Sequence, residues 1–515
     1  MDPLIASLRD PACYPHAVDR VDLEETHISW VLLAGEYAYK VKKPVKLPFL
    51  DFSTLAARRN YCAEELRLNR RTAPELYLDV VPIVRTARGP AVAAPGEPVE
   101  YAVRMRRFAG EALADAMARS GALGTDRIDA MAAVLAAFHA DAPRAAPAGR
   151  VGTPAQIAAT ALGNFNQITG LPAAASSGAR LARMRAWTAG ECERLAAVFD
   201  ARRGAGFVRE CHGDLHLGNI AFLGGRAVPF DCIEFDPELR WIDVMSEVAF
   251  LVMDLHAHGL PGLAWRLLNA WLEASGDYEG VAVLRFYLVY RAMVRAKIAL
   301  LRGDAAAFDA YLALAGALTV PGRSALLAMH GFSGSGKTTV AQALLERIGA
   351  LRVRSDVERK RLHGLPASMR SRSAPGTGHY DAASSERTYV RLALLAAAVV
   401  RSGYSVIVDA AFLRREERDR FRSLAVRLGA DFLIVSCGAQ DAVLRERVAR
   451  RAVQASDASE AEVPVLEHQF ASHQPLTTGE AATTVCVNTG SEAGLSQGVE
   501  SVASRLAARE AAALG

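Results

Sequence analysis

The stretch ALLAMHGFSGSGKTT, residues 325–339, decides the fold of the C-terminal part of the chain. Its first six residues have the apolar character of a buried strand, and VAQALLERI, residues 340–348, has the pattern of a helix. The loop between them fits the spacing G-x-x-x-x-G-K-S/T. In such loops, backbone N–H groups and a helix N-terminus face phosphate groups. Strand, glycine-rich loop and helix in this order therefore predict a phosphate-binding loop, here called the P-loop.

The predicted P-loop implies ATP and Mg²⁺ as its ligands. Lys337 is expected to reach the outer phosphates, and the Thr338 hydroxyl is expected to bind Mg²⁺. The full set of expected nucleotide-binding residues in this loop is Gly331, Phe332, Ser333, Gly334, Ser335, Gly336, Lys337, Thr338 and Thr339.

Strand-like and helix-like segments alternate after the P-loop, which predicts an α/β fold with a parallel sheet. Two of these strands run into an aspartate, in LRVRSD at Asp356 and in SVIVDA at Asp409. The carboxyl ends of parallel strands line the ligand crevice. Asp409 is therefore a candidate metal ligand and Asp356 a candidate catalytic group on the acceptor side. In VLRERVARR, Arg447 is a candidate phosphate clamp, and a solvated basic helix face is the alternative.

A second stretch, HGDLHLGN at residues 212–219, predicts another phosphoryl-transfer site. Asp214 can act as a carboxylate base, and the Asn219 amide oxygen can bind a metal. Gly224 and Gly225 form a good hairpin turn, and pairing outward from it brings Asp231 next to Asn219. Asn219 and Asp231 are therefore candidate Mg²⁺ ligands. One alternative is that these residues only build a turn. The other is a pseudokinase, in which the residues are present but no phosphoryl group is transferred.

HGDLHLGNI followed by FDCIEFD resembles the catalytic and metal-binding segments of aminoglycoside phosphotransferases and choline-kinase-like enzymes. The resemblance implies an α+β, two-lobed protein-kinase-like fold. It also implies Asp214 as the base, Asn219 and Asp231 as Mg²⁺ ligands, and His212 and Asp243 as supports of the loop.

Such folds also pair a strand lysine with a helix glutamate. Lys40 in EYAYKVKKPV and Glu65 in EELRLN are expected to form this pair, with Lys42 and Glu64 as alternatives. The sequence lacks the G-x-G-x-x-G pattern before Lys40 that protein kinases have.

The segments SDVERKRL, VIVDAAF and RERVARR resemble those of small P-loop kinases of the gluconate-kinase and polynucleotide-kinase type. The tandem arrangement resembles bifunctional aminoglycoside phosphotransferase/ATP-binding proteins. This implies a kinase-like domain at residues 1–318 and a P-loop kinase domain with a C-terminal helix at 319–515, each with an ATP site.

Composition narrows the function classes. The chain has 515 residues, 51% of them hydrophobic, and a net charge of only +4, which argues against a nucleic-acid partner. Seven cysteines without a CxxC pair fit a reducing cytoplasm. We see no signal peptide and no stretch apolar enough to span a membrane.

These observations predict an ATP-dependent phosphotransferase acting on a hydroxyl of a small molecule. The region from Arg240 to Asp309, where a polycation pocket would lie, has eight acidic and seven basic residues and so no acidic excess. The alternatives are a kinase of nucleic-acid ends acting through the P-loop half, and a regulatory ATP-binding protein with an inactive kinase-like half.

Overall fold

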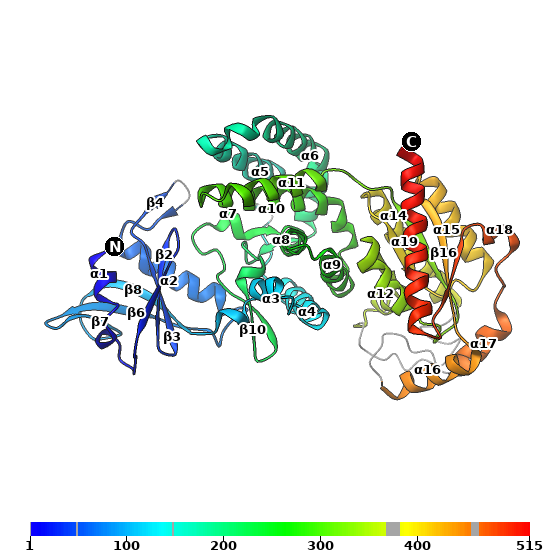
Figure 1. Cartoon of the computed structure of the whole chain (residues 1–515), viewed down its shortest axis with the longest axis horizontal. Coiled ribbons are helices and arrows are strands. Elements are labelled where there is room, and N and C mark those ends of the chain that lie inside the picture. The colour runs from blue at the N-terminus through cyan, green and yellow to red at the C-terminus, as the bar shows by residue number, and fades with distance from the viewer. Residues whose placement is uncertain (1, 48–49, 147–148, 367–381, 455–462, 515) are drawn as a thin grey trace. The chain divides into compact units, whose positions relative to one another are not determined.

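Six antiparallel strands form the sheet of the N-terminal lobe, in the order β1-β2-β3-β8-β6-β7 (Figure 1). The computed structural model describes residues 2–47, 50–146, 149–366, 382–454 and 463–514. The strands are β1 Val21–Glu25, β2 Ser29–Ala34, β3 Tyr37–Lys42, β6 Tyr77–Thr86, β7 Gly89–Val92 and β8 Pro98–Arg106. The short strands β4 Lys46–Leu47 and β5 Leu50–Asp51 pair separately from this sheet.

The two faces of this sheet have different coverings because side chains alternate along each strand. Tyr39 and Ala102 belong to a core shared with α1 (Pro3–Ser7). Val103 belongs to the core on the other face, shared with α2 (Leu55–Asn69). Lys40 and Lys42 of β3 are therefore on the α2 side.

The helical lobe contains the segment around residues 211–231. The hairpin β10 Ile220–Leu223 and β11 Arg226–Pro229 pairs Ile220 with Pro229, which confirms the turn predicted at Gly224 and Gly225. Strand β9 Val208–Glu210 pairs with β12 Trp241–Asp243. The helices of this region are α3 Ala114–Ser120, α4 Thr125–Asp141, α5 Pro154–Thr169, α6 Gly178–Gly204, α7 Pro237–Arg240 and α8 Val244–Ala257. A strand-rich lobe followed by a helical lobe is the two-lobed protein-kinase-like arrangement.

Five parallel strands form the C-terminal sheet, in the order β14-β15-β13-β16-β17. They are β13 Ala325–His330, β14 Leu351–Arg354, β15 Val406–Asp409, β16 Asp431–Gly438 and β17 Thr484–Asn488. The helices are α12 Lys337–Ile348, α13 Ser355–Leu362, α14 Ala382–Arg401, α15 Arg415–Arg427, α16 Asp441–Gln454, α17 Val463–Ser472, α18 Thr478–Ala481 and α19 Glu492–Leu514. The predicted α/β P-loop fold with a parallel sheet is confirmed.

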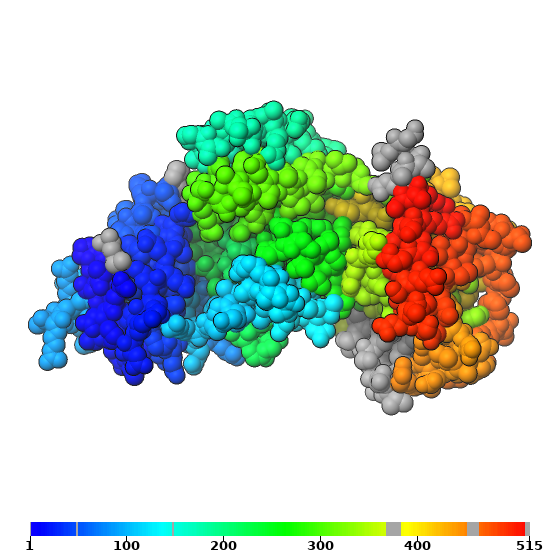
Figure 2. All heavy atoms as spheres, in the orientation of Figure 1, coloured from blue at the N-terminus to red at the C-terminus, as the bar shows by residue number. Residues whose placement is uncertain are grey.

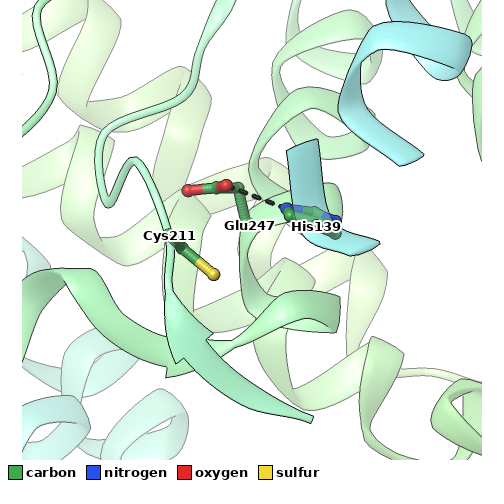
Figure 3. A group of neighbouring side chains, drawn as sticks. All are labelled: His139, Cys211 and Glu247. Atoms are coloured by element: carbon green, nitrogen blue, oxygen red, sulfur yellow. Dashed lines mark hydrogen bonds and ion pairs between the residues drawn. The ribbon is translucent and has the colours of Figure 1, made fainter. Parts of the chain in front are cut away.

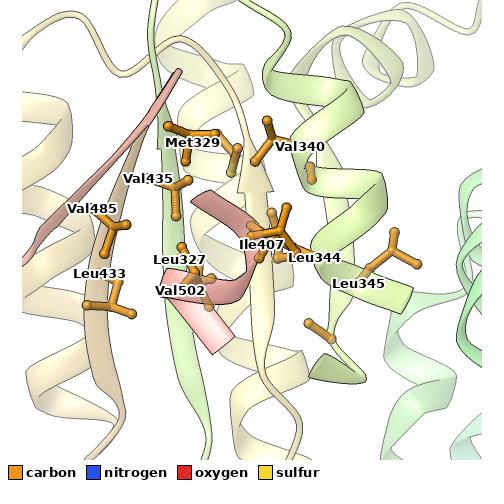
Figure 4. Packing of buried hydrophobic residues seen from close by; sticks show 14 of the residues in the cluster. Leu327, Met329, Val340, Leu344, Leu345, Ile407, Leu433, Val435, Val485 and Val502 are labelled. Atoms are coloured by element: carbon orange, nitrogen blue, oxygen red, sulfur yellow. The ribbon is translucent and has the colours of Figure 1, made fainter. Parts of the chain in front are cut away.

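The core of this sheet places the P-loop. Leu327 and Met329 of β13 pack with Val340 and Leu344 of α12, directly before and after the loop (Figure 4). On the surface, α19 forms a continuous ridge, shown in red in Figure 2. Its Val502 is fully buried in the same core.

By its contacts the chain divides into two compact units. The first contains Met1–Gln167 and Thr188–Asp254, and the second contains Ile168–Trp187 and Leu255–Gly515. The helices α9 Pro261–Ser275, α10 Val281–Leu301 and α11 Ala305–Leu318 therefore belong to the unit that contains the P-loop sheet. The sequence boundary at 318/319 stays a prediction.

The described part of the chain contains no helix that combines the length and the apolar character needed to cross a bilayer. All seven cysteines are free thiols, and Cys486 is the exposed one.

A buried ion pair fastens two loops of the second unit. Arg418 donates from Nε to Glu480 Oε1 at 2.6 Å and from a terminal nitrogen to Phe412 O at 3.1 Å. The Gln474 and Pro475 carbonyls also accept from this guanidinium, each at 3.2 Å. The hydrogen bonds of Arg418 join the loop after β15 to the segment before α18. The buried charge of Arg418 is tolerated because Glu480 pairs with it.

We expect Arg418→Met to lower the free energy of unfolding by about 3–5 kcal/mol at pH 7, because it leaves Glu480 buried without its cation. Urea unfolding of both proteins at pH 7 and at pH 3.5 measures this.

Burial would raise the pKa of Glu480, but hydrogen bonds from Arg418 and Thr477 lower it to about 2. A folded-state pKa below the unfolded value of 4.5 gives stability that is present above that pH and is lost as the pH falls toward 2. The difference between wild type and variant should therefore shrink at pH 3.5. An equal difference at both pH values would contradict the assignment.

Candidate functional site

The loop from Cys211 to Asn219 is fixed by its backbone. Gly213 has a φ of +89°, and a Cβ there would lie 2.8 Å from the Leu239 carbonyl oxygen, so no other residue fits without movement. The His212 ring nitrogen Nε2 lies 2.7 Å from the Phe230 carbonyl oxygen, which ties the loop to the end of the β10–β11 hairpin. His212 thus occupies the supporting position that the sequence predicts.

Glu247 of α8 braces the same loop (Figure 3). Its Oε1 accepts hydrogen bonds from the backbone N–H groups of His212 and Gly213, at 2.7 and 2.8 Å. Its Oε2 lies 2.9 Å from His139 Nε2. His139, Cys211 and Glu247 each bring one potential ligand atom within 4.8 Å of the others, and all three are buried. Because both carboxylate oxygens already accept hydrogen bonds, the cluster is accounted for as a brace of the loop.

Asp243 lies elsewhere in this framework. Its two oxygens accept hydrogen bonds from Arg202 of α6 at 2.7 and 2.8 Å, and both residues are buried. Asp243 therefore anchors the start of α8 to α6.

Asp214, Asn219 and Asp231 lie at one place. Asn219 Nδ2 donates to the Asp214 carbonyl oxygen at 2.9 Å and lies 3.3 Å from Asp214 Oδ2. The Phe230 N–H donates to the Asn219 carbonyl oxygen at 3.0 Å, which brings the next residue, Asp231, to Asn219 as the hairpin register predicts. The side chains of Asp214 and Asp231 are 41% and 42% exposed, so their carboxylates remain open to solvent.

The backbone of Asp231 is held in an unusual conformation. Its φ is +64°, in the left-handed region that non-glycine residues rarely adopt. Its N–H donates to the Tyr77 hydroxyl at 3.1 Å, which holds the turn. Such local strain is often found at functional sites and is sustained by the surrounding structure.

Two lysines and three carboxylates form a cluster on the α2 side of the first sheet. Lys40 Nζ donates to Glu65 Oε1 at 2.8 Å and also pairs with Asp231. Lys42 Nζ donates to Glu65 Oε2 at 2.8 Å and also pairs with Glu234. The structure thus contains the expected Lys40–Glu65 pair, and Lys42 shares the same glutamate.

Glu64, the other candidate for this pair, faces elsewhere. It accepts hydrogen bonds from Arg67 Nε at 2.7 Å and from Arg240 at 2.8 Å.

The charges of the cluster shift one another's pKa values. Burial would lower the pKa of Lys40, but Asp231, Glu65 and Glu234 outweigh burial and hold it well above its usual range. For Glu234, burial dominates over the nearby lysines and raises the pKa. Lys40 therefore stays protonated while it contacts Asp231, and it can offer a fixed positive charge to phosphate oxygens.

A histidine that the sequence analysis did not single out lies beside Asp214. His216 Nδ1 accepts a hydrogen bond from the Gly218 N–H at 3.0 Å, which leaves the proton of a neutral ring on Nε2. That nitrogen lies 3.7 Å from Asp214 Oδ2. His216 is therefore a neighbour of the Asp214 carboxylate but lies beyond hydrogen-bond distance of it.

The second site is built on backbone. A Cβ on Gly331 would lie 2.4 Å from the Cys437 carbonyl oxygen, so the loop passes β16 too closely for a side chain. Lys337 begins α12 and donates from Nζ to the carbonyl oxygens of Gly331 and Phe332, at 2.9 and 2.8 Å. The lysine thus lies across the loop. Thr338 and Thr339 follow in the first turn of α12.

Two helices from later in the chain contact the P-loop. Arg447 of α16 donates to Thr489 O at 2.7 Å and lies 3.5 Å from Gly334 O. Gln469 of α17 accepts a hydrogen bond from the Ser333 N–H at 2.8 Å. Arg447 therefore lies at the P-loop and contacts protein oxygens there, and its role as a phosphate clamp stays a prediction.

The two candidate aspartates lie on different elements at the carboxyl edge of the sheet. Asp409 is the last residue of β15, as predicted, and is buried. β14 ends at Arg354, so Asp356 lies in the first turn of α13 and not on the strand. Arg359 lies 3.6 Å from Asp356.

The residues present fit the expected ligands. Amide and carboxylate oxygens at Asn219 and Asp231, the expected metal ligands, suit Mg²⁺. Within the described residues, the buried atoms Asp409 Oδ2 and Ser335 Oγ have no hydrogen-bond partner, which leaves polar atoms available at the P-loop. The role of each of these residues stays a prediction.

Several of the residues described above were missed in the sequence. Glu234 lies in FDCIEFD, three residues after Asp231, and its proximity to an expected metal ligand was the available signal. Glu247 and Gln469 carry no motif, and only the packing of α8 and α17 brings them to the two loops.

We expect Lys42→Met to lower the free energy of unfolding by about 3–5 kcal/mol, because it leaves the buried Glu234 without its cation, whereas Glu65 still has Lys40. Lys40→Met should cost less, because its partner Asp231 is 42% exposed and can be solvated. Thermal and urea unfolding of the two variants side by side measures the difference. Equal loss in both would contradict this division of the cluster.

A family model described as an AAA domain matches residues 326–476. The uncharacterized protein Rv2004c of Mycobacterium tuberculosis is 30% identical over 459 residues, which cover 87% of this chain and 91% of that protein.

Solved structures give weaker likenesses. A Plasmodium vivax ethanolamine kinase has 9% identity and a TM-score of 0.37, with coverage of 59% of this chain and 84% of that one. A gluconokinase from Sinorhizobium meliloti has 20% identity and a TM-score of 0.26, with coverage of 37% and 99%. Because these scores are low, the fold assignment rests on the topology described above. The 30% identity over 87% of the chain shows homology, and the chain belongs to the same family as Rv2004c of Mycobacterium tuberculosis.

Proposed function

We propose that this protein is a kinase that transfers the γ-phosphoryl group of ATP to a hydroxyl group of a small molecule. The observation that carries the proposal is the meeting of Lys40, Glu65 and Asp231 beside the Asp214–Asn219 loop. Phosphoryl transfer needs a positioned base, oxygen ligands for a metal and a cation for the phosphates, and little covalent chemistry from the protein.

Each residue of the first site has a distinct role in this proposal. Asp214 accepts the proton of the acceptor hydroxyl, and His216 lies beside its carboxylate. Asn219 and Asp231 hold Mg²⁺, and Lys40 contacts the phosphates while Glu65 keeps it in place. ATP supplies the phosphoryl group, and bound Mg²⁺ would neutralise part of its charge.

The P-loop half is proposed as a second ATP site. Its loop backbone, Lys337 and Thr338 bind the nucleotide, with Thr338 and Asp409 on the metal side and Arg447 at the loop. Asp356 is proposed as the group that faces the acceptor there.

The charges of the helical lobe favour an acceptor that is not a polycation. Of the residues between Arg240 and Asp309, those up to Asp254 belong to the unit of the first site, and their acidic members all make hydrogen bonds within the chain. These are Asp243, Glu247 and Asp254. A polycation such as an aminoglycoside would need carboxylates that are open to it. A neutral hydroxylated molecule or a singly charged amine fits better.

We expect Asp214→Asn to reduce acceptor-stimulated ADP release by about 10²–10⁴-fold when the P-loop is disabled by Lys337→Ala, because the base is removed. The assay uses the full-length chain with ATP, Mg²⁺ and a panel of sugars, choline-like amines, nucleosides and aminoglycosides.

Asp200→Asn is the matched control, since Asp200 is an exposed aspartate of α6. Unchanged turnover in the Asp214 variant would refute the base assignment. If no acceptor stimulates either half, the phosphotransferase proposal itself fails.

A further inference from the structure

Helix α9 covers the open edge of the P-loop sheet. Among the residues that the structure describes, β14 is an edge strand with no strand partner on one side of its backbone. Asn269 of α9 donates to the Ala350 carbonyl oxygen at 3.0 Å and accepts from the Arg352 N–H at 2.6 Å. The Tyr278 hydroxyl donates to the Arg352 carbonyl oxygen at 3.0 Å. These contacts satisfy the edge and fix α9 against it.

Glu273, one turn after Asn269 on α9, holds two arginines of this strand. Its Oε2 lies 3.2 Å from an Arg352 nitrogen and its Oε1 lies 2.9 Å from Arg354. Both arginines are largely buried, and Glu273 is 21% exposed. One carboxylate thus fixes the position of two cations.

Both arginines also reach the proposed metal side of the P-loop. Arg352 lies 3.5 Å from the Thr338 carbonyl oxygen. Arg354 is the cross-strand neighbour of Asp409, and its Nε lies 3.9 Å from Asp409 Oδ2. That oxygen is buried and accepts no hydrogen bond from any residue that the structure describes. Arg354 therefore stands between two carboxylates, with a hydrogen bond to Glu273 and a longer ion pair to Asp409.

We propose that Glu273 is a positioning residue of the P-loop site. By bonding Arg354, it keeps this cation from closing onto Asp409 and leaves the Asp409 carboxylate open to a divalent metal. The inference rests on the metal role proposed for Asp409. It assigns to α9, a helix outside the P-loop half of the sequence, a part in setting the metal affinity of that half.

This arrangement predicts opposite effects of the Glu273 and Arg354 substitutions on Mn²⁺ affinity. Without the charge of Glu273, Arg354 moves from its present 3.9 Å to a direct hydrogen bond with Asp409 and competes with the metal. Glu273→Gln should therefore weaken Mn²⁺ binding about fivefold, the size of one partly exposed ion pair. Removing the competing cation as well, in Glu273→Gln with Arg354→Gln, should restore the wild-type affinity. A purely structural loss would add in the double variant and would not cancel.

The experiment uses the full-length chain carrying Asp231→Asn, which removes a proposed metal ligand of the first site. Mn²⁺ binding in the presence of ADP is followed by electron paramagnetic resonance, and thermal unfolding confirms that each variant is folded. Arg266→Gln is the matched control. It breaks another ion pair between α9 and α12, Arg266–Glu346 at 2.7 Å, that does not involve the two arginines. It should leave Mn²⁺ affinity unchanged.

The outcomes separate this inference from the proposed function. Equal weakening by Glu273→Gln and Arg266→Gln, an unchanged Glu273→Gln, or a double variant weaker than the single one each overturns the inference. In those cases the P-loop proposal stands if Lys337→Ala abolishes ADP binding at that half. If the wild-type P-loop half binds no Mn²⁺ with ADP, the proposed P-loop function fails first.

Discussion

The buried charges on the α2 side of the first sheet are the constraint on which the N-terminal site depends. Lys40 and Lys42 contribute two positive charges, and Glu65, Asp231 and Glu234 contribute three negative ones. Burying such groups is costly unless each has a partner, so their positions are fixed by one another. The set carries one negative charge in excess, next to the Asp214 carboxylate. A divalent cation at Asp231, a proposed metal ligand, would offset this excess. The charge of the cluster is therefore compatible with the metal role proposed for Asp231.

The proposed phosphate site at the P-loop relies on main-chain groups and not on a cluster of buried charges. Its phosphate-facing surface is main chain, held in place by close contacts at Gly331 and by a parallel sheet whose core continues into α12. Such a loop needs few charged side chains, because N–H groups at a helix N-terminus already favour anions. Substitutions should therefore act differently on the two sites. The first is sensitive to single charges, whereas the second is sensitive to anything that adds bulk to the loop or changes the cations near Asp409.

Much of both sites could be predicted from the local sequence. The parts that could not be predicted share one cause. The P-loop and the hairpin at Gly224–Gly225 depend on neighbours within the chain, so spacing alone places Lys337 and brings Asp231 to Asn219. The Lys40–Glu65 pair needed the resemblance to a known fold. Strand alternation alone could not separate Lys40 from Lys42, and in the structure both bind Glu65. Glu247, Gln469 and Glu273 act through tertiary packing of helices whose sequences show only an apolar face, and no motif marks them.

Helices α9–α11 connect the two halves of the sequence. They precede residue 319 in sequence, but their contacts place them in the unit that contains the P-loop sheet. An exposed edge strand with open N–H and C=O groups is a site for unwanted pairing, and α9 closes it with Asn269 and Tyr278. A P-loop half cut at residue 319 would lose this cover as well as Glu273, and would leave Arg352 and Arg354 without their carboxylate. The relative from Mycobacterium tuberculosis matches over 87% of this chain, which spans both halves. The stretch before residue 319 thus supplies the hydrogen bonds that cover this edge of the P-loop sheet.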